Sequence, residues 1–140
     1  AIRQALLCLP RDVAKLRTDV LEMRQKMRDG HPNPSGLFDI KHDPGGLVDV
    51  EFCVQYLVLA HAHTYPELTA NVGNIALLKR CAELGLLPPE IALPAADAYR
   101  ELRRLQHRAK LQGAEHARAP AEQAAPAGQA VRALWTAVFG

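Results

Sequence analysis

The sequence feature that most constrains the fold is the regular spacing of apolar residues between positions 91 and 109. They recur at intervals of four and three residues, at Ile91, Ala95, Ala98, Leu102, Leu105 and Ala109. This period places them along one face of an α-helix. Because a long apolar face of this kind packs against other helices, the segment predicts one member of a helical bundle.

Three further segments show helical spacing. The apolar positions of residues 11–29 are Val13, Leu16, Val20, Met23 and Met27. Residues 70–84 form a second helical segment, with Thr69 as its predicted N-cap and Gly85 as its predicted C-cap. The apolar positions near the end of the chain, which predict a short final helix, are Val131, Leu134, Trp135 and Val138.

Residues 47–60 are apolar on almost every side, which predicts the central and most buried helix. Alanine and leucine, both strong helix formers, dominate the composition, and sustained alternation of apolar and polar residues is absent from the sequence. The fold class predicted is all-α, a bundle of about five helices without a sheet. Residues 113–130 are alanine-rich and contain two prolines, which predicts a loose connector, with or without a short helix, within a single helical domain spanning 1–140.

The sequence and its composition also limit the kind of protein to which this domain can belong. The chain begins at AIRQALLCLPRD, a pattern that predicts the middle of a helix and therefore a fragment of a longer protein. A net charge of +2 is too small to indicate a nucleic-acid partner, and no apolar run is long enough to predict a membrane span. Three scattered cysteines without a CxxC pair predict reduced, buried thiols in a cytoplasmic protein.

The segment 39–55, DIKHDPGGLVDVEFCVQ, is unusual because it places polar residues inside the most apolar helix. Asp49 lies in the first turn of that helix, where a carboxylate complements the helix dipole. Glu51 and Gln55 are four residues apart and share one face, so a buried Glu51 requires a partner. These residues favour two readings equally, helix capping with internal hydrogen bonds or a site that faces another domain.

Other site chemistries are less well supported. HExxH and the Cys/His zinc spacings are absent, so the sequence predicts no metal site, and neither phosphate-binding glycine motif occurs. Arg100, Arg104 and Arg108 lie four residues apart and form a basic ridge on the helix of residues 91–109. This ridge is either a solvated face or a surface that binds anions or docks a partner.

The segment starting at Phe38 resembles the signature of the glutamine synthetase adenylyltransferases, F-(D/N)-(I/L)-K-x-(D/E)-x-G-G-(I/L)-x-D-(I/V)-E-F-x-x-Q-Y-L-V-L. The matching positions are Phe38, Asp39, Lys41, Asp43, Gly45, Gly46, Asp49, Glu51, Phe52, Gln55, Tyr56, Leu57 and Leu59. The residues 23–28 resemble the family's preceding helix, and AYRELRRLQHRAKL resembles its Y-R-x-L-R-x-x-(E/Q)-H-R helix. The resemblance covers roughly residues 11–139.

This resemblance implies the helical domain that follows a nucleotidyltransferase domain in an enzyme that adds AMP to glutamine synthetase. Asp-Pro-Gly-Gly together with Asp49 is similar to the C-terminal, adenylylating half of the family. The full enzyme is expected to use ATP and Mg²⁺, neither of them bound by this fragment, which carries no catalytic residue. Its implied partners are the preceding nucleotidyltransferase domain, glutamine synthetase and the PII signal protein.

The resemblance also implies roles for the motif. Lys41, Asp43, Gly45, Gly46 and Asp49 are expected on an open surface that faces the catalytic domain or its nucleotide. Glu51 and Gln55 are expected to anchor the motif loop by hydrogen bonds. The alternative is a helical bundle that only docks glutamine synthetase or PII. It predicts that Asp49 and Glu51 are satisfied internally and that an apolar or charged patch is exposed elsewhere.

Overall fold

The computed structural model describes residues 8, 12–70 and 72–140. The expected helix at the start of the chain lies outside these residues. The described elements are α2 (Val13–Asp29), β1 (Phe38–Asp39), α3 (Leu47–His61), a 3-10 turn η1 (Pro66–Thr69), α4 (Asn74–Glu83), α5 (Pro89–Leu111), β2 (Arg118–Ala119) and α6 (Ala121–Phe139). This all-α architecture with five described α-helices confirms the predicted fold class.

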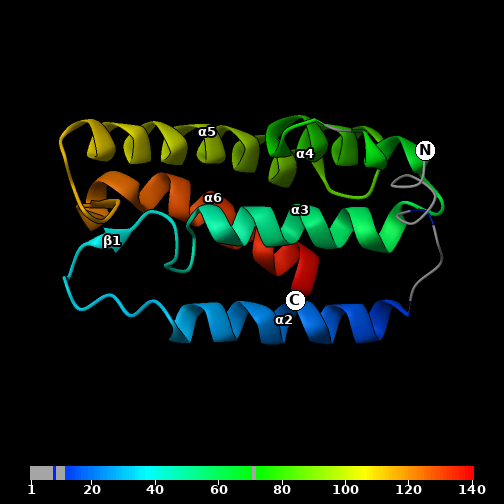
Figure 1. The fold of residues 1–140 in the computed structure, drawn as a ribbon. Helices are drawn as coiled ribbons and strands as arrows, with labels where there is room; N and C mark the ends of the chain where they lie inside the picture. Colours follow the sequence, from blue (N-terminus) through cyan, green and yellow to red (C-terminus); the bar gives the residue numbers. More distant parts are fainter. Residues whose placement is uncertain (1–7, 9–11, 71) are drawn as a thin grey trace.

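The helices lie in three layers (Figure 1). α4 and α5 form one outer layer, α3 and α6 the middle layer, and α2 the other outer layer. α3 is the most buried helix of the described part of the chain, as its apolar sequence predicted, and contributes ten buried residues of its fifteen. Its first turn lies at the same end of the bundle as the loop 38–46, the end of α5 and the start of α6.

The predicted absence of a sheet needs one correction, because two short strands pair. β1 and β2 pair antiparallel, with Phe38 opposite Ala119 and Asp39 opposite Arg118. Ile40 extends the pairing by donating its N–H to the Ala117 carbonyl at 2.9 Å. Two-residue strands are too short to show alternation in a sequence, which is why the pattern did not reveal them.

The structure corrects the predicted loose connector over residues 113–130, because α6 begins at Ala121 and continues through Pro126. Alanine is the best helix former, and Pro120 at the N-cap leaves the first turn free of proline. Pro126 is exposed, and Ala124, Ala127 and Gly128 on the buried face hold this half of α6 against the bundle. Tertiary packing therefore prevails over the helix-breaking signal.

The helix predicted for residues 70–84 also starts later than expected. Thr69 ends the turn η1, and the N-cap of α4 is Gly73. Leu84 is the C-cap, and Gly85 follows it in a left-handed conformation with φ of 76°. The described helices include none with the length and apolar character needed to cross a membrane.

Candidate functional site

In the Gly-Gly turn before α3, the backbone N–H groups donate hydrogen bonds to other groups of the same chain. α3 has no side-chain N-cap, and Gly46 occupies the cap position. The four consecutive N–H groups bond within 3.0 Å, as Gly45 to Asp49 Oδ2, Gly46 to the Asp43 carbonyl, Leu47 to the Ile40 carbonyl and Val48 to the Lys41 carbonyl. Because these donors are already used, the turn is not a cradle for a phosphate group.

The two glycines serve close packing instead. A Cβ on Gly46 would lie 2.6 Å from the Ile40 carbonyl oxygen. A Cβ on Gly45, whose φ is 90°, would lie 3.0 Å from the Gly128 carbonyl oxygen and 2.9 Å from Arg132 Nη1. The missing side chains thus let the loop fold onto α3 and let α6 pack against the turn.

Asp49 is buried, with 3% of its surface exposed, and its carboxylate is fully engaged. Oδ1 pairs with Nε of Arg24 at 2.5 Å, and Oδ2 accepts the Gly45 N–H at 2.9 Å. Arg24, which is 1% exposed, also donates from Nη2 to the His42 carbonyl. Asp49 therefore differs from the expected open, outward-facing carboxylate, because α2 covers it with a paired arginine.

Asp43 organises the loop. Its Oδ2 accepts the Asp39 N–H at 2.9 Å and an Asn33 Nδ2 hydrogen at 3.0 Å. Asp39 in turn accepts the N–H groups of Lys41 and His42 with Oδ1. These bonds turn the loop so that Lys41 projects from it into solvent, as its exposure shows. Of the charged motif residues expected on an open surface, Lys41 is exposed, Asp43 is half-buried and Asp49 is buried.

Lys41 lines a polar cavity of about 300 Å³ between the motif and α5. The other lining residues are Leu47, Glu51, Tyr99, Arg103 and Gln106. The cavity brings together the two sequence segments that carry the family resemblance, one from the loop and α3 and the other from α5. We identify this cavity, the motif cavity, as the candidate functional site. Its ammonium and guanidinium groups fit the oxygens of an anionic group, and its Glu51 fits a cation or a hydrogen-bond donor.

Tyr99 connects the motif cavity to α4. Its hydroxyl donates to Glu51 Oε2 at 3.1 Å and accepts a hydrogen from Asn74 Nδ2 at the same distance. Burial is the main factor that raises the pKa of Tyr99. The Asn74 hydrogen bond opposes this rise, and the charge of Glu51 adds to it. Arg103 Cζ lies 5.9 Å from the centre of the Tyr99 ring, which places a cation over the aromatic face.

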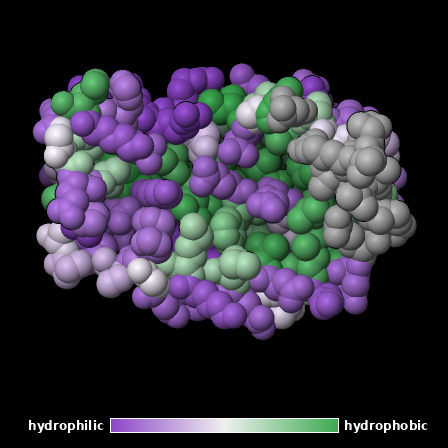
Figure 2. Space-filling view, in the orientation of Figure 1, coloured by the Kyte–Doolittle hydropathy of each residue, from purple (hydrophilic) through white to green (hydrophobic). Residues whose placement is uncertain are grey.

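Glu51 and Gln55 do not anchor the motif loop as expected. Glu51 is half-buried and accepts its hydrogen bond from Tyr99 of α5. Gln55 is exposed and lines an apolar groove of about 170 Å³ between α2 and α3, with Asp19, Val20, Met23, Phe52 and Leu59. Figure 2 shows apolar residues gathered between these two helices. Glu51 lines the motif cavity with Lys41 but bonds to α5, and no hydrogen bond joins Gln55 to the loop among the described residues.

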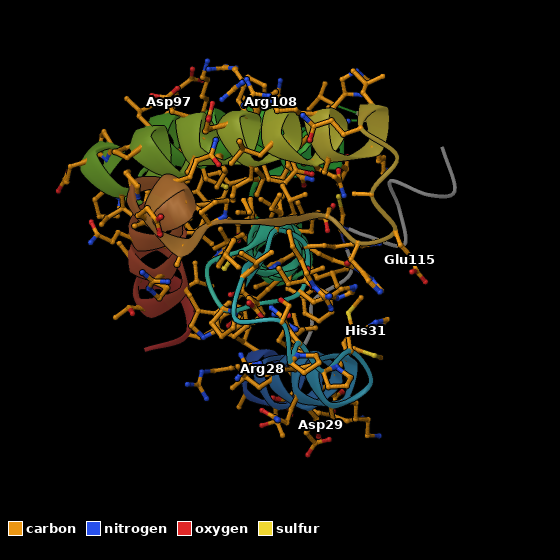
Figure 3. All side chains as sticks on the ribbon, turned by 90° about the vertical axis from the view of Figure 1, so that its left-hand side faces the viewer. Arg28, Asp29, His31, Asp97, Arg108 and Glu115 are labelled. Atoms are coloured by element: carbon orange, nitrogen blue, oxygen red, sulfur yellow. The ribbon has the colours of Figure 1, made fainter. Side chains whose placement is uncertain are left out.

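The predicted basic ridge is exposed along the outer side of α5. Arg100 pairs with Asp97 at 3.1 Å, and Arg104 forms two bonds with Glu101 at 2.6 and 2.9 Å. Figure 3 places Asp97 and Arg108 on this outer side. Exposed pairs three residues apart on one helix contribute little free energy, and here they neutralise two of the three ridge arginines. This arrangement favours a solvated face over an anion-binding ridge.

Sequence reasoning missed Arg24, Tyr99, Arg103 and Gln106 as site residues. Each lies in a segment that carries the family resemblance, and that is the signal that could have singled them out. Their convergence depends on how α2 and α5 pack around α3, which spacing along the chain does not encode. No cluster of three or more metal-ligating side chains occurs within residues 8, 12–70 and 72–140.

Comparisons with known proteins show that the chain matches one family over more than half of its length. Residues 14–119 match the family model described as GlnD PII-uridylyltransferase. Similar relatives are bifunctional glutamine synthetase adenylyltransferase/adenylyl-removing enzymes. Those of Aromatoleum aromaticum, Nitrosomonas europaea and Bordetella bronchiseptica are 60%, 50% and 55% identical over 99% of this chain. The chain spans only 15–16% of the length of these relatives.

Proposed function

We propose that this chain, which belongs to the GlnD PII-uridylyltransferase family, is the helical domain that supports AMP transfer to glutamine synthetase in a bifunctional adenylyltransferase. In the full enzyme it follows the adenylylating nucleotidyltransferase domain, which supplies the ATP and Mg²⁺ chemistry in the cytoplasm. The signature from Phe38 to Leu59 and the high identity to these enzymes over almost the whole chain support this assignment.

The observation that carries the proposal is the motif cavity. It contains Lys41, Glu51 and Arg103, which come from two segments that carry the family resemblance and are distant in sequence. Charged side chains lining one open cavity suit a contact with a charged partner group rather than a packing role. In this proposal, Lys41 and Arg103 bind acidic groups of the nucleotidyltransferase domain or its nucleotide, and Tyr99 and Asn74 hold Glu51 in place.

The chain alone should not transfer AMP, because the described residues include no carboxylate cluster for metal-dependent transfer. The test incubates the 140-residue chain with glutamine synthetase, labelled ATP and Mg²⁺. Labelled AMP on the synthetase, from a preparation free of other adenylyltransferase, would refute this part of the proposal.

The role of the motif cavity is tested in the full enzyme with Lys41→Gln and Arg103→Gln. Both side chains are exposed, so thermal stability should be unchanged, whereas the initial rate of adenylylation should fall by about 10²-fold if a positioning or electrostatic contact is lost. Lys79→Gln, an exposed lysine of α4, is the matched control and should retain the rate. Normal rates for both cavity variants would reject the proposed role of the cavity.

A second function, docking of glutamine synthetase or the PII protein, is favoured by two observations. Asp49 and Glu51 are satisfied within the bundle. The α2–α3 groove leaves Met23 60% exposed beside Phe52 and Leu59. Met23→Glu should then weaken binding of one of these proteins in a pull-down, while Lys41→Gln binds normally. The opposite pattern would favour the motif cavity as the functional surface.

A further inference from the structure

A separate cavity lies between the last turn of α2 and α6, on a face of α3 different from that of the motif cavity. It holds about 200 Å³ and is lined by Arg28, Pro44, Asp49, Arg132, Trp135 and Thr136. Arg28 lies on α2 at the lower edge of the bundle in Figure 3. Three of the six lining residues come from α6, which the family signature does not cover.

The guanidinium of Arg132 lies where two glycines leave room for it. A Cβ on Gly45 would lie 2.9 Å from Arg132 Nη1, and a Cβ on Gly128 would lie 3.2 Å from the same atom. The guanidinium thus occupies space that side chains at these positions would fill. Neither Arg132 nor Arg28 forms an ion pair with a residue of the described part of the chain.

Positive charge exceeds negative charge around this cavity. Asp49 is its one lining carboxylate, and both Asp49 oxygens are engaged by Arg24 and by the Gly45 N–H. Arg24 also keeps a buried Nη1 without a hydrogen-bond partner among the described residues. The two guanidinium groups that line the cavity, those of Arg28 and Arg132, therefore face no unpaired carboxylate there, and a bound anion would offset their charge.

We propose that this cavity binds a phosphate group. Guanidinium groups match the geometry of phosphate oxygens, and the Thr136 hydroxyl can donate one further hydrogen bond. The volume lies below that of pockets that enclose whole drug-sized ligands, so it suits a single compact group. The phosphate is either free in solution or carried by a larger molecule whose remainder stays outside.

The chain contains a single tryptophan, Trp135, which lines the cavity and reports on binding through its fluorescence. The experiment titrates the 140-residue chain with sodium phosphate at an ionic strength held constant by sodium chloride. Calorimetry under the same conditions measures binding without relying on the fluorophore. We expect a saturable fluorescence change and a matching heat of binding. A response no larger than that to chloride in both measurements would overturn the proposal.

The arginine variants locate the site. Arg28→Gln and Arg132→Gln should each weaken phosphate binding by about tenfold or more, since each removes a charged hydrogen-bond donor. Arg28 is exposed on the surface of α2, so its variant should keep the native melting temperature. Arg108→Gln, an exposed arginine at the far side of α5, is the matched control. Native affinity in both cavity variants, or an equal loss in Arg108→Gln, would overturn the proposal.

A third arm identifies the source of the phosphate. Glycerol 3-phosphate carries the same group on a larger molecule. Tighter binding of inorganic phosphate indicates a site for the free ion, and tighter binding of the ester indicates a group carried by a larger ligand. Each result supports a phosphate site, provided that Arg28→Gln weakens it.

Discussion

At the scale of single residues, the buried ion pair between Arg24 and Asp49 determines how the motif should respond to mutation. The two residues are 1% and 3% exposed, and Asp49 also receives the Gly45 N–H. Breaking such a pair leaves one charge buried and unpaired, and that costs more than the intact pair contributes. The main effect of substitutions at Asp49 should therefore be a lower free energy of unfolding, with any effect on activity secondary to it.

Asp49→Asn should lower the free energy of unfolding by about 3–5 kcal/mol, because Arg24 loses its counter-charge while the side-chain shape is kept. Urea denaturation measures this difference. Arg24→Met combined with Asp49→Asn removes both charges, and the double variant should be more stable than the sum of the single losses implies. Strictly additive losses would show that the two charges are not coupled.

The sequence identified Asp49 as an important residue but did not show which groups it contacts. Its position in the first turn of an apolar helix was consistent with a cap or with an interdomain contact. The choice depended on Arg24, which is 25 residues earlier and lies on a helix whose apolar stripe excludes it. An arginine that points into the core is not visible as a periodic signal, so local pattern could not resolve the alternatives.

At the scale of elements, two helices begin at an N-cap glycine for different reasons. Gly46 starts α3 and Gly73 starts α4, both with extended backbone and without a side-chain cap. Carbonyl oxygens lie within 3 Å of the position of a Cβ on Gly46, whereas nothing lies within 4 Å at Gly73. Only the first glycine is required by its surroundings.

Gly46→Ala should destabilise the protein by about 1–3 kcal/mol more than Gly73→Ala, because the added methyl meets the backbone carbonyl of Ile40. Both variants share the effect of alanine at an N-cap, so their difference isolates the steric contact. Thermal and urea unfolding of the two variants give the comparison. Equal losses would mean that the loop moves aside and that the close approach is not needed.

The helices themselves were well predicted, because amphipathic spacing such as Ile91 to Ala109 is a local property that survives in the structure. The first half of α6 was not predicted, because Pro126 and Gly128 are helix-breaking signals, and the contact of Gly128 with Gly45 that outweighs them joins residues 83 positions apart. The motif cavity escaped prediction for the same reason, and the β1–β2 pairing did so because its strands are only two residues long.

At the scale of the whole molecule, packing determines which thiols are available. Cys53 of α3 and Cys81 of α4 are buried, while Cys8 is partly exposed, and all three are free. Burial raises the pKa of the Cys81 thiol to about 11, and burial together with the charge of Asp49 raises that of Cys53 further. A raised pKa removes the thiolate that reacts with electrophiles.

In the native protein at pH 8, a thiol reagent should label Cys8 rapidly and Cys53 and Cys81 only through unfolding. Mass spectrometry after brief labelling measures this, and labelling in urea should modify all three residues. Cys8→Ser is the matched variant and should abolish the rapid phase. Rapid native labelling of Cys53 would show that α3 is not the protected centre of the bundle.

The place of α6 in the bundle has a consequence for how the protein is made. The ribosome completes α2 to α5 before α6, yet α6 packs against both α3 and α5 and sets Gly128 against the turn that begins α3. A nascent chain that ends before Ala121 therefore exposes apolar surface that has no cover within itself. Native packing around α3 can be completed only after α6 has left the exit tunnel, and during that interval the uncovered apolar surface is open to aggregation.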